Sequence, residues 1–168
     1  LIMGLIKPDH GCIMFNGRNT FSSPPVKSSK KIGYVGQDVF MFNDSIKNNI
    51  IFGREFDAKK FNKAIEIAHL VDVLDSLPEN ENTFVGDSGA KLSGGQIQRV
   101  SIARALYDIP DFLIFDEATS SLDTELSNSI LAKVQQLKGH ITLLQVTHKL
   151  QETAGSDRVY VMKNGKII

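Results

Sequence analysis

Residues 92–96 read Leu-Ser-Gly-Gly-Gln, and residues 112–117 read Phe-Leu-Ile-Phe-Asp-Glu. In the first stretch, Ser93 is followed three residues later by Gln96, which is the capping-box pattern of a helix N-terminus. Gly94 and Gly95 carry no side chains where the backbone must come close to another group. Because the first turn of a helix offers unpaired N–H groups and the positive end of the helix dipole, this stretch predicts a phosphate-binding helix start.

The second stretch is an unbroken apolar run that ends in two carboxylates, Asp116 and Glu117. Such a run predicts a strand buried on both faces of a parallel sheet. Its acids then lie at the carboxyl end of the strand, where open α/β sheets bind their ligands. Residues 141–146 predict another buried strand, which leads to His148, and residues 32–35 predict a short strand that leads to Gln37.

Together these residues closely resemble the ABC-type ATPases, and the resemblance covers most of the chain. Residues 92–96 match the signature motif of that family, and residues 112–123 match its Walker B strand and D-loop. Gln37 matches the glutamine of its Q-loop. Residues 83–89, Thr-Phe-Val-Gly-Asp-Ser-Gly, resemble a loop of ABC exporters in which glutamate is more usual than Asp87. One motif of the family, the phosphate-binding G-x-x-x-x-G-K-[ST], does not occur in the sequence.

The resemblance implies a P-loop NTPase-like, three-layer α/β fold with a mainly parallel core sheet and an inserted α-helical subdomain. We expect residues 1–43 and 110–168 to form part of the core, and residues 44–109 to form the helical subdomain with the signature motif. Because the P-loop motif is missing, we interpret the chain as a fragment that begins just downstream of it and lacks the N-terminal strands. A length of 168 residues is enough for one domain with a hydrophobic core.

The resemblance also implies a chemistry, the hydrolysis of ATP with Mg²⁺ as cofactor. Glu117 would act as general base on the attacking water, and His148 would stabilise the γ-phosphate. Asp116 would hold Mg²⁺ through water, together with Gln37, whose side-chain amide can both accept and donate hydrogen bonds. The remaining nucleotide-binding residues would serve ATP held by a second copy, and they are Ser93, Gly94, Gly95, Gln96 and Asp123.

The partners implied by the resemblance are a second nucleotide-binding domain, identical or different, and the transmembrane domains of an exporter. The two nucleotide-binding domains would close head to tail on ATP. The transmembrane domains would contact the Gln37 loop and residues 83–89, with Phe40 and Phe42 partly exposed. The chain would then lie at the cytoplasmic face of a membrane, and the bacterial inner membrane is the expected one. A formal net charge of zero argues against a nucleic-acid partner.

Two alternatives stay open. The chain could belong to a soluble ABC ATPase that acts on DNA or ribosomes, although the neutral charge and the exporter-like residues 83–89 argue against this function. It could also be a non-hydrolytic fragment that contributes only signature-motif contacts. In that case its own affinity for a triphosphate is expected to be poor, because the P-loop motif is missing.

Overall fold

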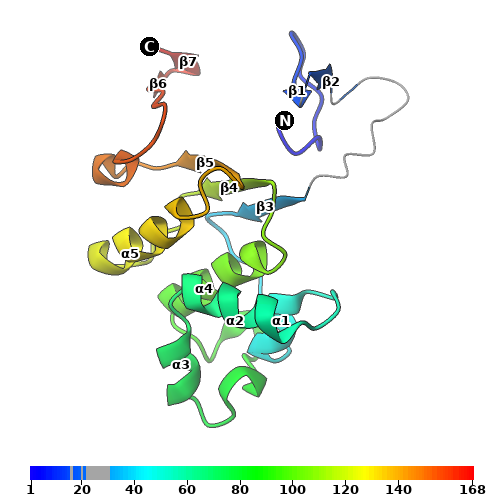
Figure 1. Ribbon diagram of the computed structural model, residues 1–168, viewed down its shortest axis with the longest axis vertical. Helices are drawn as coiled ribbons and strands as arrows, with labels where there is room; N and C mark the ends of the chain where they lie inside the picture. Colours follow the sequence, from blue (N-terminus) through cyan, green and yellow to red (C-terminus); the bar gives the residue numbers. More distant parts are fainter. Residues whose placement is uncertain (16, 20, 22–30) are drawn as a thin grey trace.

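The computed structural model describes residues 1–15, 17–19, 21 and 31–168. A three-stranded sheet lies at the centre of the molecule (Figure 1). Four helices, α1 to α4, gather on one side of it, and two terminal hairpins lie at the opposite end together with both chain termini. Residues 16, 20 and 22–30, which belong to the predicted core part, lie outside the described residues.

The central sheet is parallel, as the sequence predicted, and its strand order is β3-β4-β5. The central strand is β4, and it pairs with β3 from Ile32↔Phe112 to Val35↔Phe115. On its other side it pairs with β5 up to Asp116↔Val146. The strands span β3 Ile32–Val35, β4 Phe112–Asp116 and β5 Thr142–Val146.

The two apolar strands differ in burial. The prediction for β4 is confirmed, because Leu113, Ile114 and Phe115 are all buried. The prediction that β5 is equally buried is wrong: its residues are half-buried or exposed, and Val146 is 47% exposed. The physical reason is position, since β5 is an edge strand that pairs on one side alone in the described part of the chain.

The helices α1, α2 and α4 begin at residues whose side chains cap them, whereas α3 follows Leu70 and has no side-chain cap. Ser45 caps α1, and Asp57 caps α2 by accepting hydrogen bonds from the backbone N–H groups of Lys59 and Lys60. Both α1 and α2 pack against α4. The helices span α1 Ile46–Ile51, α2 Ala58–Ile67, α3 Val71–Ser76 and α4 Gly94–Leu106.

The other elements are a helix that follows the sheet, three short 3-10 helices and two small hairpins. Asp123 caps the helix α5, whose buried residues include Ile130 and Val134. The helix is α5 Thr124–Gln135, and the 3-10 helices are η1 Asn80–Asn82, η2 Asp87–Gly89 and η3 Leu150–Thr153. The hairpin strands are β1 Met14–Phe15 with β2 Arg18–Asn19, and β6 Met162–Lys163 with β7 Lys166–Ile167.

One hydrophobic cluster joins the sheet and the helices. It contains Leu113 of β4, Ile46 of α1, Leu106 of α4 and Ile130 of α5. The α/β fold with a parallel core sheet and a group of helices is therefore confirmed. The boundaries of the helical subdomain at residues 44 and 109 stay a prediction, because packed side chains of this cluster lie on both sides of them.

Candidate active site

Three predicted site residues follow the ends of neighbouring strands. β3 ends at Val35, opposite Phe115, and β4 ends at Asp116, opposite Val146. Because the strands are parallel, their carboxyl ends form one edge of the sheet. Gln37, Glu117 and His148 therefore follow this edge two, one and two residues beyond the ends of β3, β4 and β5.

The closest contact at this edge joins Glu117 and His148. The His148 Nε2 lies 2.7 Å from the Glu117 Oε1, and the side chains are 87% and 23% exposed respectively. The backbone N–H of Glu117 donates to the carbonyl of Val146 at 3.0 Å, which continues the pairing of β4 with β5 past the strand end. A largely shielded carboxylate thus contacts an imidazole that faces solvent, an arrangement suited to handling a proton at the sheet edge.

Glu117 has an unusual backbone conformation. Its φ is +52°, in the left-handed region that residues other than glycine rarely adopt. Such a conformation costs about 1–3 kcal/mol and persists where the surroundings hold it in place. The turn directs the chain out of β4 immediately after Asp116, so the two neighbouring carboxylates have different environments.

Asp116 lies beside Tyr34 of β3. The Tyr34 hydroxyl donates to the Asp116 Oδ2 across 3.4 Å, and Gly36 leaves room for that hydroxyl, which a Cβ at position 36 would meet at 2.7 Å. Burial, followed by the charge of Asp116, raises the pKa of Tyr34. Gln37 is exposed just beyond. In the described part of the chain no group of three or more His, Cys, Asp or Glu side chains could hold a metal ion.

A second part of the candidate site is the N-terminus of α4. The predicted capping box is confirmed, since the Ser93 hydroxyl accepts from the Gln96 N–H at 3.2 Å and the Gln96 Oε1 accepts from the Ser93 N–H at 2.8 Å. Ser93 and Gly94 are exposed, and Gly95 is half-buried. The first turn of a 13-residue helix is therefore accessible, as anion binding requires.

The loop between β4 and α5 packs against this helix start. A Cβ on Gly95 would lie 3.2 Å from the Ser121 carbonyl oxygen and 3.3 Å from the Leu122 side chain. Asp123 follows Ser121 by two residues. Its carboxylate accepts from the Leu126 N–H at 2.9 Å and so caps α5. The structure thus gives Asp123 a structural contact, and its predicted role in nucleotide binding stays a prediction.

Gln98 connects the two parts of the site, and sequence reasoning assigned it no role. This α4 side chain is 2% exposed. Its Nε2 donates to the Glu117 carbonyl at 3.2 Å and to the Ser120 hydroxyl at 3.4 Å, and its Oε1 accepts from the Ser121 N–H at 2.9 Å. One amide therefore links the helix that begins at Ser93 to the strained turn at Glu117.

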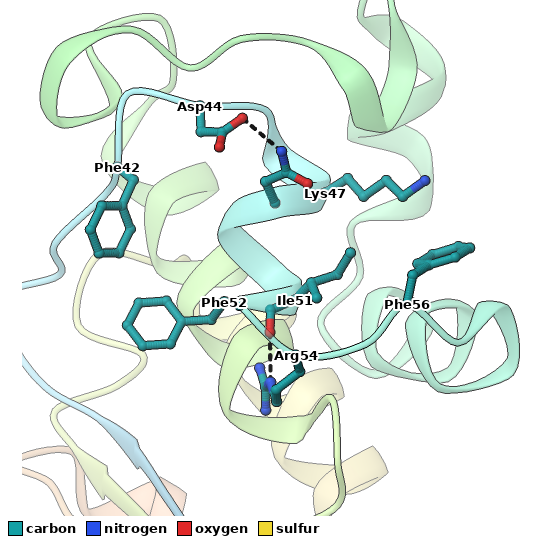
Figure 2. Close-up of a pocket in the computed structure, with 9 residues that line it drawn as sticks. Phe42, Asp44, Lys47, Ile51, Phe52, Arg54 and Phe56 are labelled. Carbon is teal, nitrogen blue, oxygen red and sulfur yellow. Dashed lines mark hydrogen bonds between the residues drawn. The ribbon is translucent and has the colours of Figure 1, made fainter.

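A groove lies beside α1 in the helical part (Figure 2). Its volume is about 670 Å³. Three aromatic side chains, Phe42, Phe52 and Phe56, line it and are about half exposed, and Lys47 lies 4.0 Å from the Phe56 ring. Phe40 is 63% exposed and packs edge-on against Phe42, so the prediction that these two residues are partly exposed is confirmed.

Residues 83–89 lie directly beside residues 43–46, which lead into α1 and this groove. The Val85 N–H donates to the Asp44 carbonyl, and the Ile46 N–H donates to the carbonyl of Thr83. The Asp87 carboxylate accepts from the Asn43 side-chain amide at 2.7 Å. The loop of residues 83–89 and the segment that follows Gln37, which the sequence predicted to face the same partner, are therefore neighbours in the structure.

Residues 1–120 match the model of a family described as ABC transporter. The chain is 38% identical over 172 residues to an "ATP-dependent lipid A-core flippase" of Ralstonia nicotianae, across 100% of this chain and 29% of the relative. It is 43% identical over 141 residues to the flippase of the same name from Pseudoalteromonas translucida, across 83% of this chain and 24% of the relative.

A solved structure is also similar. It is titled "Structure of a bacterial Atm1-family ABC exporter with ATP bound", and it matches this chain with a TM-score of 0.88 and 36% identity. The match covers 96% of this chain and 29% of the exporter chain. The chain thus spans less than a third of the length of these relatives.

Proposed function

Because this chain belongs to the ABC transporter family, we propose that it works as part of the nucleotide-binding domain of an ABC exporter. ATP binding and hydrolysis would drive two such domains together and apart, and so move a substrate across a membrane. The observation that carries this proposal is the 2.7 Å contact between Glu117 and His148, beside Asp116 at one edge of a parallel sheet.

The proposed reaction is transfer of the γ-phosphoryl group of ATP to water. The water oxygen attacks the γ-phosphorus, the bond to the β–γ bridging oxygen breaks, and ADP and phosphate leave. Glu117 takes the proton of the attacking water, and the imidazole of His148 donates a hydrogen bond to the γ-phosphate as charge builds up. The contact between the two side chains supports this division, because both can then reach a single phosphate.

Mg²⁺ is the proposed cofactor, and Asp116 would hold it together with Gln37. Mg²⁺ in nucleotide sites keeps several waters and uses one or two carboxylates plus the phosphates, so it needs no cage of protein ligands. The carboxylate of Asp116 at the end of β4 fits this requirement. When bound, Mg²⁺ neutralises charge on the phosphates, and the proton transfer is left to Glu117.

The start of α4 would bind the nucleotide of a second domain. Exposure of Ser93 and Gly94, with the half-buried Gly95 and Gln96, supports an anion contact at a helix start. The capping box holds Ser93 and Gln96 in fixed positions, which reduces the entropy lost on binding. Asp123, which caps α5 beside this helix start, is proposed to contact the same second domain.

The transmembrane domains of the exporter are the proposed occupant of the groove shown in Figure 2. Half-exposed aromatic side chains beside Lys47 and Asp44 offer both apolar contact and charge, as interface residues do. Residues 83–89 border the same segment and extend this surface. No helix in the described residues is long and apolar enough to cross a membrane. We propose that the chain lies at the cytoplasmic face of the membrane that contains these transmembrane domains.

The relatives favour an exporter over a soluble ABC ATPase. Their names are those of lipid A-core flippases and of an Atm1-family exporter, and none of these names refers to DNA or ribosomes. The formal net charge of zero also argues against a nucleic-acid partner. The non-hydrolytic alternative differs from the proposal in one measurable respect, because Glu117 would then have no effect on phosphate release.

The test is phosphate release by the complete protein that carries this chain, with Glu117→Gln as the variant and Glu125→Gln as its matched control. Glu125 is an exposed carboxylate in the first turn of α5. Loss of the general base should slow turnover at least about hundredfold, while ATP-bound dimers accumulate on size-exclusion chromatography. The control should keep the unmutated rate. Phosphate release by Glu117→Gln near the unmutated rate would overturn the proposal.

A further inference from the structure

Glu152 is a buried carboxylate outside the candidate active site. It lies in the 3-10 helix η3, which follows His148, and is 4% exposed. Carboxylates are almost never buried unless other groups pair with them, because removing their charge from water is costly. The partners of this carboxylate therefore indicate what its burial achieves.

Both oxygens of Glu152 have partners from separate segments. Oε1 accepts from the Thr119 hydroxyl at 2.9 Å, with the Lys149 Nζ 3.5 Å away. Oε2 accepts from the Thr147 hydroxyl at 2.8 Å and from the Gln145 side-chain amide at 3.0 Å. One carboxylate thus joins β5, the turn after β5 and the loop after β4.

Two of these partners flank His148. Thr147 precedes it and Lys149 follows it, and the Lys149 N–H donates to the Thr147 hydroxyl at 3.0 Å, which closes the turn around the histidine. Lys149 also donates through Nζ to the carbonyl of Thr119 at 3.1 Å, two residues after Glu117. The cluster therefore ties the turn that carries His148 to the loop that carries Glu117.

The histidine itself has little else to hold it. Its side chain is 87% exposed, so packing does not fix the ring. Glu117 is held from the other side by Gln98 and by its own bond to Val146. The position of His148 relative to Glu117 is then set mainly by the backbone at residues 147–149, which Glu152 organises.

We propose that Glu152 is a positioning residue that holds His148 against Glu117. The inference rests on the proposed function, because the pair matters for hydrolysis if both side chains act on ATP. A gain in stability does not account for the carboxylate, since replacing a buried ion pair with apolar side chains is often neutral or stabilising. Glu152 thus acts through the residues beside His148 and does not itself touch the nucleotide.

The first test measures kcat and KM for ATP in the complete protein. Glu152→Ala should lower kcat by about tenfold or more, as loss of groups that orient a site residue does, and leave KM within about twofold. Glu152→Gln should restore kcat to within about threefold, because an amide keeps one acceptor oxygen and the Thr119 hydroxyl can turn to accept from its NH₂. Tyr107→Phe is the control, because it removes a buried hydroxyl with two hydrogen bonds in the helical part.

The second test uses the complete protein and needs no turnover. NMR signals of the His148 ring should move in Glu152→Ala towards their positions in Glu117→Gln, while those of His69 stay in place. If Glu152→Ala does not fold, Thr147→Val replaces it, since this change removes the hydroxyl between Glu152 and the turn.

Two results would overturn the inference. They are an unchanged kcat in Glu152→Ala, whether or not KM rises, and His148 signals that move in Glu117→Gln alone. If the unmutated complete protein hydrolyses no ATP, the proposed function fails, and the NMR result then decides the role of Glu152 by itself.

Discussion

The amide of Gln98 gives the sharpest test of how the site is held together. Replacing it with methionine keeps the side-chain volume and removes all three hydrogen bonds, to the Glu117 carbonyl, the Ser120 hydroxyl and the Ser121 N–H. A volume-conserving exchange in a packed interior costs less than about 1.5 kcal/mol by itself. Any larger loss of stability therefore measures the hydrogen bonds.

The magnitude follows from the groups left behind. A buried backbone group that loses its partner costs about 1–3 kcal/mol, and here two such groups, the Glu117 carbonyl and the Ser121 N–H, face a side chain that is 2% exposed. Ser121 is itself exposed, so water can reach part of this region. We expect Gln98→Met to lower the free energy of unfolding by about 2–4 kcal/mol, towards the lower end of the summed costs.

The assay is urea-induced unfolding of the chain, followed by circular dichroism. Gln135→Met is the matched control, because Gln135 is an exposed glutamine of α5 whose side-chain amide donates to the Ala154 carbonyl. Its replacement should change stability by less than about 0.5 kcal/mol, as surface substitutions do. If Gln98→Met is as stable as this control, the reasoning about the connecting amide is refuted.

Three further outcomes are expected. Gly95→Ala should destabilise the chain by about 1 kcal/mol relative to Gly94→Ala, because a Cβ at 95 meets backbone at 3.2 Å and one at 94 meets nothing nearer than 4.0 Å; equal midpoints in urea would contradict this. Burial lowers the pKa of His69 below 6.5, so the unfolded chain takes up the proton first as pH falls and stability decreases below about pH 6.5. In thermal melts, His69→Gln should no longer lose stability between pH 6.5 and lower pH through this histidine. If the pH dependence of the melting temperature is unchanged, His69 is not its cause. Asp57→Ala should cost about 1 kcal/mol by removing the cap of α2, whereas Asp57→Asn should unfold near the unmutated midpoint, and equal losses for both would show that the cap is unimportant.

Local patterns in the sequence were enough to predict several elements. The spacing of Ser93 and Gln96 predicted the capping box, and the apolar run from Phe112 to Phe115 predicted the central strand. Both features depend on residues that are close in sequence. The position of Glu117 next to His148 depends on two separate segments, and it could be expected because each residue follows the carboxyl end of a predicted parallel strand.

Other features that depend on distant segments could not be predicted. β5 also reads as a buried strand in sequence, with Leu143, Leu144 and Val146 among its residues, and its exposure follows from its place at the sheet edge. Glu152 has the sequence context of an exposed loop residue, and its burial depends on Thr119, which lies 33 residues away. Gln98 is one polar residue of a helix in sequence. Its role in holding the loop after β4 depends on contacts with that loop, which the sequence does not show.

The central claim is that Glu117 and His148 act as one unit on one terminal phosphate. A double-mutant cycle of ATP turnover in the complete protein, with Glu117→Gln, His148→Ala and both together, tests it most directly. We predict that each single change abolishes most turnover and that the double variant is no slower than Glu117→Gln alone. Rate losses that multiply in the double variant would mean that the two side chains act independently, which contradicts the claim.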